Sequence, residues 1–142
     1  MAATFQELGA YIYDSVEGYR EAKDKSDAGR LQAAFATRLA ERERTLARFN
    51  AQLADAGEAI IEDGSTLGDF HRRWLNVTEA IASGDNAVIS AVEDGEGFLK
   101  ERLEDALEQK DFSPGEREVI AAALEEVAEG EAFAQCLEEQ PV

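Results

Sequence analysis

Histidine and cysteine, the side chains most often used in transition-metal and nucleophilic chemistry, are scarce in this sequence of 142 residues, which has one histidine, His71, and one cysteine, Cys136. A two-iron site in a four-helix bundle needs an inward Glu on each of two helices and an inward Glu-x-x-His on each of the other two. One histidine cannot supply that paired motif, so we expect no metal and no cofactor. Nucleotide-binding loops, Ser-His-Asp sets and Cys-x-x-Cys pairs are also missing, and we therefore expect no enzymatic activity.

Charged residues at core positions are the more informative feature. Placed at about 100° per residue, Arg38 and Arg42 fall at the centre of an apolar helical stripe, and so does Glu131 on a later helix. Glu96 also lies within a stripe. Burying an unpaired charge is very costly, and the heights along the helices put Arg38 level with Glu131 and Arg42 level with Glu96. We therefore predict that these four residues form a polar core network, to which the core aromatic Tyr19 could donate a hydrogen bond.

Two interpretations of this network remain open. It could be a structural ion-pair layer that fixes the register of the helices, or a small pocket for an anion or carboxylate built on two arginines. We favour the structural interpretation because two acids are available to neutralise two bases. His71 and Trp74 lie three residues apart and are expected to pack on the bundle. Cys136 lies away from the apolar stripe of its helix and is expected to be an inert thiol.

The overall charge restricts the partners. There are 31 acidic residues against 14 basic ones, which gives a net charge of −17. Such a field repels nucleic acids and anionic membrane surfaces. We therefore expect neither of these as a partner, and consider a protein partner or a homo-oligomer instead. The single cysteine, the lack of a signal-like N-terminal segment and the lack of a membrane-length apolar stretch favour a cytoplasmic protein.

The elements that must position these residues are helices. Apolar residues recur with the helical period in long segments at about 4–23, 28–56, 86–110 and 114–139, and in a shorter one from about residue 66 to a break at 83–85. Thr4 is predicted to cap the first helix and Gly57 to end the second. Ser113 and Glu116 are predicted to form a capping box that starts the last.

The lengths of the connections predict how the helices are arranged. Short loops make the first two long helices antiparallel, and likewise the last two. The crossover at about 57–85 is long enough to run the length of a bundle and holds the short helix. We therefore predict an all-α protein with a single domain over residues 1–142. Its predicted architecture is a four-helix bundle of up-down-down-up topology, as in ferritin-like folds.

Four segments carry a resemblance to a known family, and they occur in the family's order and spacing: Asp14–Ala22, Ala40–Arg42, Gly68–Trp74 and Glu93–Glu96. From about Phe5 to Leu137 the chain resembles a bacterial family of ferritin-like four-helix-bundle proteins described as a domain of unknown function. The His71–Trp74 segment is the most specific part of the match. The resemblance implies the fold and suggests an association with stress responses, but it implies no reaction.

The leading hypothesis is a non-catalytic helical-bundle protein of stress-response or protein-interaction type. The alternative is a metal-binding ferritin-like protein with an unconventional carboxylate site. Metal analysis of protein purified without chelator separates the two hypotheses most simply.

Overall fold

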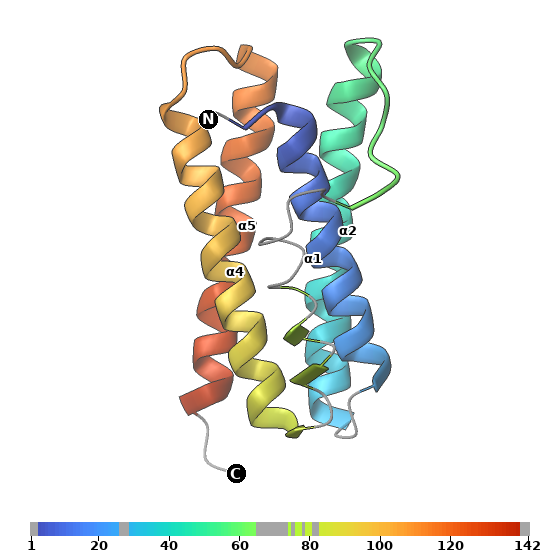
Figure 1. Ribbon diagram of the computed structural model, residues 1–142, viewed down its shortest axis with the longest axis vertical. Coiled ribbons are helices and arrows are strands. Elements are labelled where there is room, and N and C mark those ends of the chain that lie inside the picture. The colour runs from blue at the N-terminus through green and yellow to red at the C-terminus, as the bar shows by residue number, and fades with distance from the viewer. Residues whose placement is uncertain are drawn as a thin grey trace.

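Four long helices pack side by side in the computed structural model, which describes residues 3–25, 29–64, 74, 76–77, 79–80 and 83–139 (Figure 1). They are α1 (Phe5–Lys25), α2 (Gly29–Asp55), α4 (Asp85–Glu108) and α5 (Pro114–Glu139). No strand occurs among these described residues. The prediction of an all-α four-helix bundle is therefore confirmed.

The predicted helix ends are confirmed by their hydrogen bonds. The Thr4 hydroxyl accepts the backbone N–H of Glu7 at 3.0 Å. Ser113 and Glu116 form the reciprocal capping box, with N–H to side-chain oxygen distances of 2.9 and 3.1 Å. Gly57 has a φ of 74° after the end of α2, and the next residue donates its N–H to Leu53 O at 2.9 Å. This is the left-handed helix ending that glycine allows at lowest cost.

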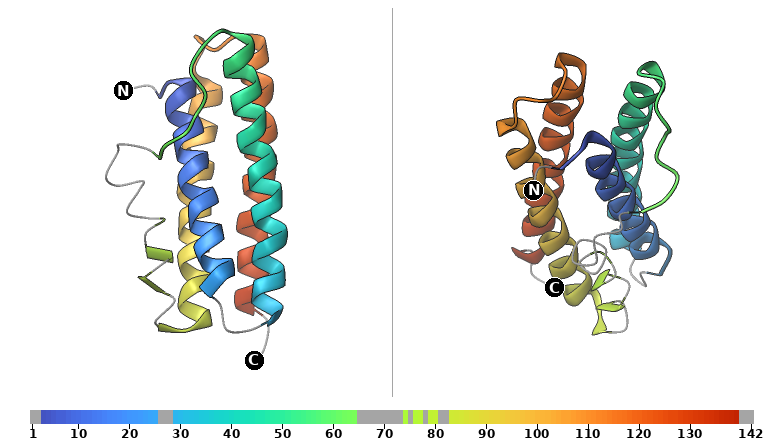
Figure 2. Two further views of the ribbon diagram at one scale, coloured as in Figure 1. Left: turned by 90° about the vertical axis from the view of Figure 1, so that its right-hand side faces the viewer. Right: turned by 45° about the horizontal axis from the view of Figure 1, so that its top comes forward.

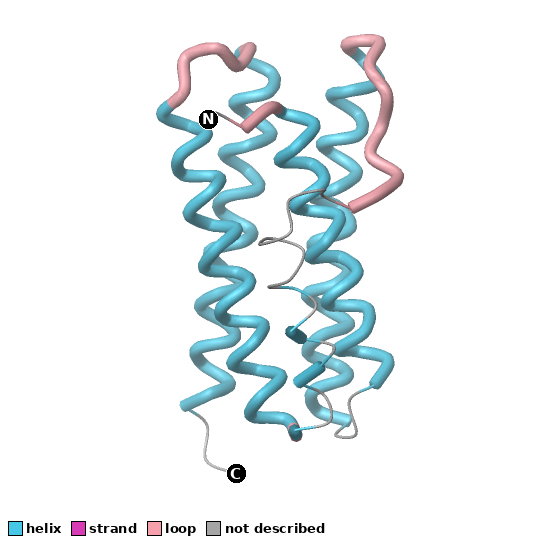
Figure 3. The backbone as a smooth tube through the Cα atoms, in the orientation of Figure 1, coloured by secondary structure: helices cyan, strands magenta, loops and turns pink. Residues whose placement is uncertain are grey.

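The helices form two hairpins, α1–α2 and α4–α5, which pack against each other through α1 with α4 and through α2 with α5. Helices α2 and α4 therefore lie across a diagonal of the bundle. Figure 3 shows two loops in pink at the top of the bundle, one after α2 and one between α4 and α5. None of the described helices has an apolar stretch long enough to cross a bilayer.

The crossover joins the end of α2 to the start of α4, and these two points lie at opposite ends of the bundle (Figure 1). Its first part descends along the outside of α1, as the left view of Figure 2 shows. Ile61 holds it there, because its N–H donates to Asn50 Oδ1 at 2.7 Å and its side chain lies against Gly9. The predicted short helix falls largely on residues outside the described part of the chain, and so does His71.

Apolar side chains from all four helices fill the interior. The apolar residues along one side of α1 are buried, and Phe5 of α1 stacks on Phe49 of α2 with ring centroids 4.7 Å apart. Burial of such side chains is the main force that holds amphipathic helices together. The middle of this core is polar, however, and that polar layer is the candidate site.

Candidate functional site

Each long helix contributes a polar residue from its own midpoint. These residues are Ser15 of α1, Arg42 of α2, Glu96 of α4 and Glu126 of α5. Ser15, Arg42 and Glu96 are fully buried, and the Glu126 side chain is 11% exposed. Because the four midpoints lie at one level, their side chains meet inside the bundle. Together with Tyr19, Arg38 and Thr45 they form what we call the central polar layer.

Arg42 is the hub of the central polar layer. Its Nη1 donates to Ser15 Oγ at 2.7 Å and to Glu96 Oε1 at 2.9 Å, and its Nη2 donates to Glu96 Oε2 at 2.5 Å. Its Nε donates to Glu126 Oε1 at 2.6 Å. One guanidinium therefore bonds to all three other helices, and every nitrogen that it carries has a partner.

Glu126 is the second acid of the layer and binds both arginines. Its Oε2 accepts Arg38 Nη2 at 2.6 Å and Arg42 Nη2 at 3.1 Å. Thr45 donates its hydroxyl to Oε1 at 2.8 Å, and Arg38 Nη2 also reaches the backbone oxygen of Glu126 at 2.9 Å. Arg38 Nε has no hydrogen-bond partner among the described residues. Charge-assisted bonds of this kind are stronger than neutral ones and fix the geometry of the groups they join.

The Glu96 carboxylate accepts three hydrogen bonds. Besides the two bonds from Arg42, Tyr19 donates its hydroxyl to Glu96 Oε2 at 2.8 Å, and the Arg42 guanidinium lies 5.4 Å from the centre of the Tyr19 ring. Gly130 of α5 leaves the space for this carboxylate, because a methyl group at Gly130 would overlap Glu96 Oε2. The missing side chain at Gly130 is thus a requirement of the layer.

Burial and charge shift the protonation equilibria of the layer in opposite directions. Burial raises the pKa of the Glu96 carboxyl, although Arg42 opposes the shift. Burial also acts to raise the pKa of Glu126, but the charge and hydrogen bonds of Arg42, the Thr45 hydroxyl and the Arg38 charge together outweigh it, and the pKa is lowered. Burial and the nearby Glu96 raise the pKa of Tyr19 well above its usual value. Burial acts to lower the pKa of Arg42, but the two carboxylates raise it further.

Comparison with known proteins assigns the family. The family described as "Domain of unknown function (DUF2383)" matches residues 1–109, which is more than three quarters of the chain. The chain belongs to the DUF2383 family. No curated protein and no solved structure matches it. The matched region contains Ser15, Tyr19, Arg42 and Glu96, whereas Glu126 lies beyond it on α5.

The structure of this DUF2383 chain brings together four of the five residues predicted for the network: Tyr19, Arg38, Arg42 and Glu96. It does not bring in Glu131, and that prediction is corrected. The Glu131 side chain is 21% exposed and pairs with Lys100 of α4 at 3.2 Å. Glu126 of α5 lies beside the two arginines instead.

The prediction named Glu131 where the structure has Glu126, and the difference has a geometric cause. The buried positions of α5 include Ile120, Ala123, Val127 and Ala134. At about 100° per residue, Glu126 and Glu131 lie on opposite flanks of this stripe, Glu126 towards α2 and Glu131 towards α4. Leu124 lies on the Glu131 side of this stripe and is only half-buried, so a projection that includes Leu124 among the apolar residues places the centre of the stripe too close to Glu131. Gly130, a buried position without a side chain, was the signal that could have corrected the centre.

The remaining predicted residues lie outside the layer. Trp74 is 3% exposed and its indole fits between Gly18 of α1 and Gly95 of α4, where any Cβ would collide with the ring. The packing predicted for Trp74 is therefore observed. Cys136 is free and exposed on α5.

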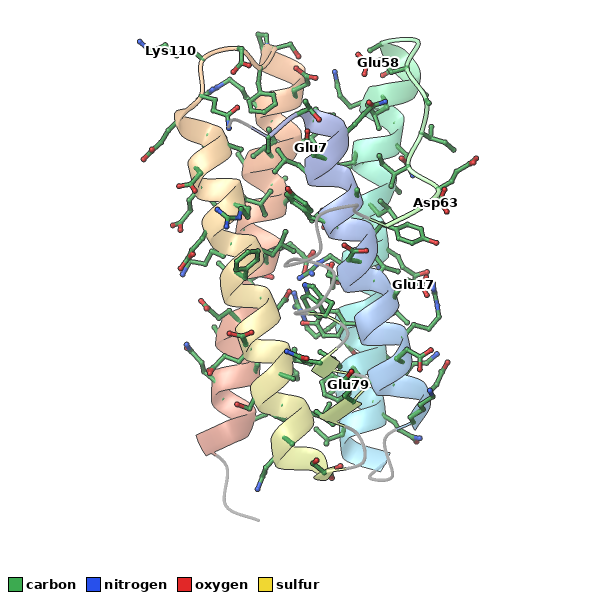
Figure 4. The ribbon with its side chains drawn as sticks, in the orientation of Figure 1. Glu7, Glu17, Glu58, Asp63, Glu79 and Lys110 are labelled. Carbon is green, nitrogen blue, oxygen red and sulfur yellow. The ribbon has the colours of Figure 1, made fainter. Side chains whose placement is uncertain are left out.

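Carboxylates elsewhere do not gather into a metal site within the described part of the chain, where no three His, Cys, Asp or Glu side chains are placed to hold an ion. Glu17 of α1 points away from the bundle (Figure 4) and pairs with Arg20. A groove of about 310 Å³ between α2 and α5 opens over Glu126 and Thr45, and its rim carries both Arg48 and Glu129. The charges of this rim are mixed.

Proposed function

We propose that this chain is a non-catalytic helical-bundle protein in which the central polar layer serves assembly of the bundle rather than chemistry. The observation that carries the proposal is the saturation of Arg42, whose three nitrogens are all bonded to side chains of its own chain. The two acids and two arginines of the layer have a formal net charge of zero. An anion would have to displace Glu96 or Glu126 to bind here, so the structural interpretation is favoured over the anion pocket.

The proposal includes a ferritin-like, up-down-down-up arrangement in a single domain. Opposite placement of the two ends of the crossover supports that topology (Figure 1). In a two-iron protein of that kind, inward carboxylates surround metal ions at the middle of the bundle. Here the Arg42 guanidinium occupies the middle, and its positive charge takes the role of counter-ion to Glu96 and Glu126.

The role proposed outside the core is protein interaction, including interaction in a stress response. A net charge of −17 supports a protein partner over a nucleic acid or an anionic membrane. The chain as a whole carries this negative charge, so binding to a basic partner should weaken as salt concentration rises.

Metal analysis tests the proposal against the alternative of an unconventional carboxylate metal site. The chain is purified without chelator and analysed for iron and manganese, and Glu96→Gln is analysed in parallel. We expect less than one metal ion per ten chains in both. Iron or manganese bound in a fixed ratio to the wild type and lost in Glu96→Gln would overturn the structural proposal, because it would place a metal in the layer. Calorimetric titration with acetate and phosphate, with no heat of binding expected, tests the anion pocket.

A further inference from the structure

The charges of the central polar layer are divided between the two hairpins. Both arginines lie on the α1–α2 hairpin and both acids on the α4–α5 hairpin. The hydrogen bonds that cross between the hairpins in this layer run in one direction. Arg38, Arg42 and the hydroxyls of Tyr19 and Thr45 donate, and oxygens of Glu96 and Glu126 accept.

This division makes the faces of the two hairpins complementary in charge, and it disfavours packing between two copies of the same hairpin. Two α1–α2 hairpins packed together would bury four guanidiniums, and two α4–α5 hairpins would bury four carboxylates. Burying like charges without counter-ions costs several kcal/mol per charge. Only the pairing of one α1–α2 hairpin with one α4–α5 hairpin neutralises the layer, so the charges select the partner as well as stabilise it.

Nothing in this selection requires both hairpins to belong to one chain. The apolar contacts and the layer are the same whether the α4–α5 hairpin comes from its own chain or from a second copy. The covalent link is residues 56–84. Ile61 and Trp74 of this link pack against α1 and in the slot between α1 and α4, so in an exchanged dimer residues 75–84 cross from one bundle to the other. About ten residues span roughly 35 Å when extended. Exchange of an identical element between copies is a low-cost route to a dimer.

We propose that the Arg38/Arg42 face of the α1–α2 hairpin and the Glu96/Glu126 face of the α4–α5 hairpin form a recognition pair, and that the partner it fits is a second copy of this chain bound by exchange of hairpins. The inference rests on the proposed structural role of the layer. At micromolar concentrations the tethered pairing within one chain wins, because the link gives an effective concentration near the millimolar range. The exchanged dimer becomes significant when the concentration approaches that range.

Complementation between two full-length variants tests the recognition pair. Arg42→Glu leaves one arginine facing three acids, and Glu96→Arg leaves one acid facing three arginines, so each variant alone should lose helicity and melt at a lower temperature. When the two are unfolded in urea and refolded together, the α1–α2 hairpin of Glu96→Arg and the α4–α5 hairpin of Arg42→Glu form a bundle with the native layer. We expect a 1:1 heterodimer by native mass spectrometry, at least tenfold more abundant than either homodimer, with recovered helicity.

A matched pair of exposed charges provides the control. Arg44 and Glu104 are exposed on α2 and α4, and the variants Arg44→Glu and Glu104→Arg should stay folded and give no heterodimer after refolding together. A mixture of the two core variants that behaves as the sum of its parts would overturn the proposal, and so would core variants that each remain stable monomers.

A measurement on the wild type covers the case in which the core variants do not refold. Wild-type chains with and without isotope labels are refolded together at micromolar and at near-millimolar concentration. Mixed dimers should increase at least tenfold with concentration, and a monomer at both concentrations would overturn the proposal. If the chain stays monomeric and the metal analysis is negative, only the proposal of hairpin exchange is disproved. If stoichiometric metal is found in the layer, the proposed function itself is disproved.

Discussion

Arg42 of α2 reaches across the diagonal of the bundle to Glu96 of α4, and the two side chains form paired hydrogen bonds of 2.9 and 2.5 Å with both residues completely buried. Helices on a diagonal share few backbone contacts, so this ion pair is a direct tie between α2 and α4. The bidentate geometry also fixes the rotation of both helices about their axes, because a guanidinium can donate two hydrogen bonds to one carboxylate only within a narrow range of orientations.

Removing Glu126 should destabilise the protein far more than removing Glu131. Glu126→Ala leaves two buried arginines short of a counter-ion and should cost about 3–5 kcal/mol of unfolding free energy. Glu131→Ala breaks only the partly exposed pair with Lys100 and should cost well under about 1 kcal/mol. Urea unfolding of the two variants decides between them. Equal losses would show that Glu126 is not the acid that serves the arginines.

Gly130→Ala should be destabilising although alanine favours helix. The new methyl overlaps Glu96 Oε2, which Arg42 and Tyr19 hold in place, so we expect a loss of about 1–3 kcal/mol from overpacking. Gly97→Ala is the control in the neighbouring helix. There the Cβ would lie 2.7 Å from the mobile end of Glu131, which can turn towards solvent, and helix propensity should add up to about 1 kcal/mol. Thermal melts that rank the two variants in the opposite order would contradict this role for Gly130.

Gly95→Ala should push Trp74 out of its slot. A Cβ at Gly95 would lie 2.7 Å from the indole ring, a rigid group that cannot fold away. Trp74 is the single tryptophan of the chain, so its fluorescence reports on this site alone and should shift to longer wavelength as the ring meets water. Gly29→Ala has no neighbour within 4 Å and should leave the emission unchanged. An unshifted spectrum for Gly95→Ala would show that the slot does not depend on glycine.

The fold could be predicted from the sequence because its signals are local. The caps at Thr4 and Ser113 and the stop at Gly57 depend on residues within a few positions of one another, and all three are confirmed. The partner of Arg38 is different, since it depends on which flank of α5 faces α2. A helical projection gives the angle of a residue around one helix, but it does not say which neighbouring helix lies at that angle.

Lowering the pH should change the contributions of the two carboxylates to the free energy of unfolding in opposite directions. The lowered pKa of Glu126 means that its contribution to stability is present above its unfolded pKa of about 4.3 and is lost as pH falls through the folded value. The stability gap between wild type and Glu126→Gln should therefore narrow at low pH. The raised pKa of Glu96 means that the folded state binds this proton more tightly, so the gap to Glu96→Gln should widen as pH falls towards about 4.3.

Urea unfolding between about pH 3 and 7 measures both gaps. Two carboxylate variants with gaps that change in the same direction would contradict the assigned environments.

The central claim, that the layer acts through balanced charge in the core, is tested most directly by removing one charge and then all four. Arg42→Met should cost about 3–5 kcal/mol, because it strands buried carboxylates. The combined variant Arg38→Met, Arg42→Met, Glu96→Leu and Glu126→Leu removes the charges together with their desolvation penalty. Urea unfolding should find this combined variant helical and more stable than Arg42→Met alone. A combined variant that is less stable than the single one, by about the sum of four separate losses, would contradict the account.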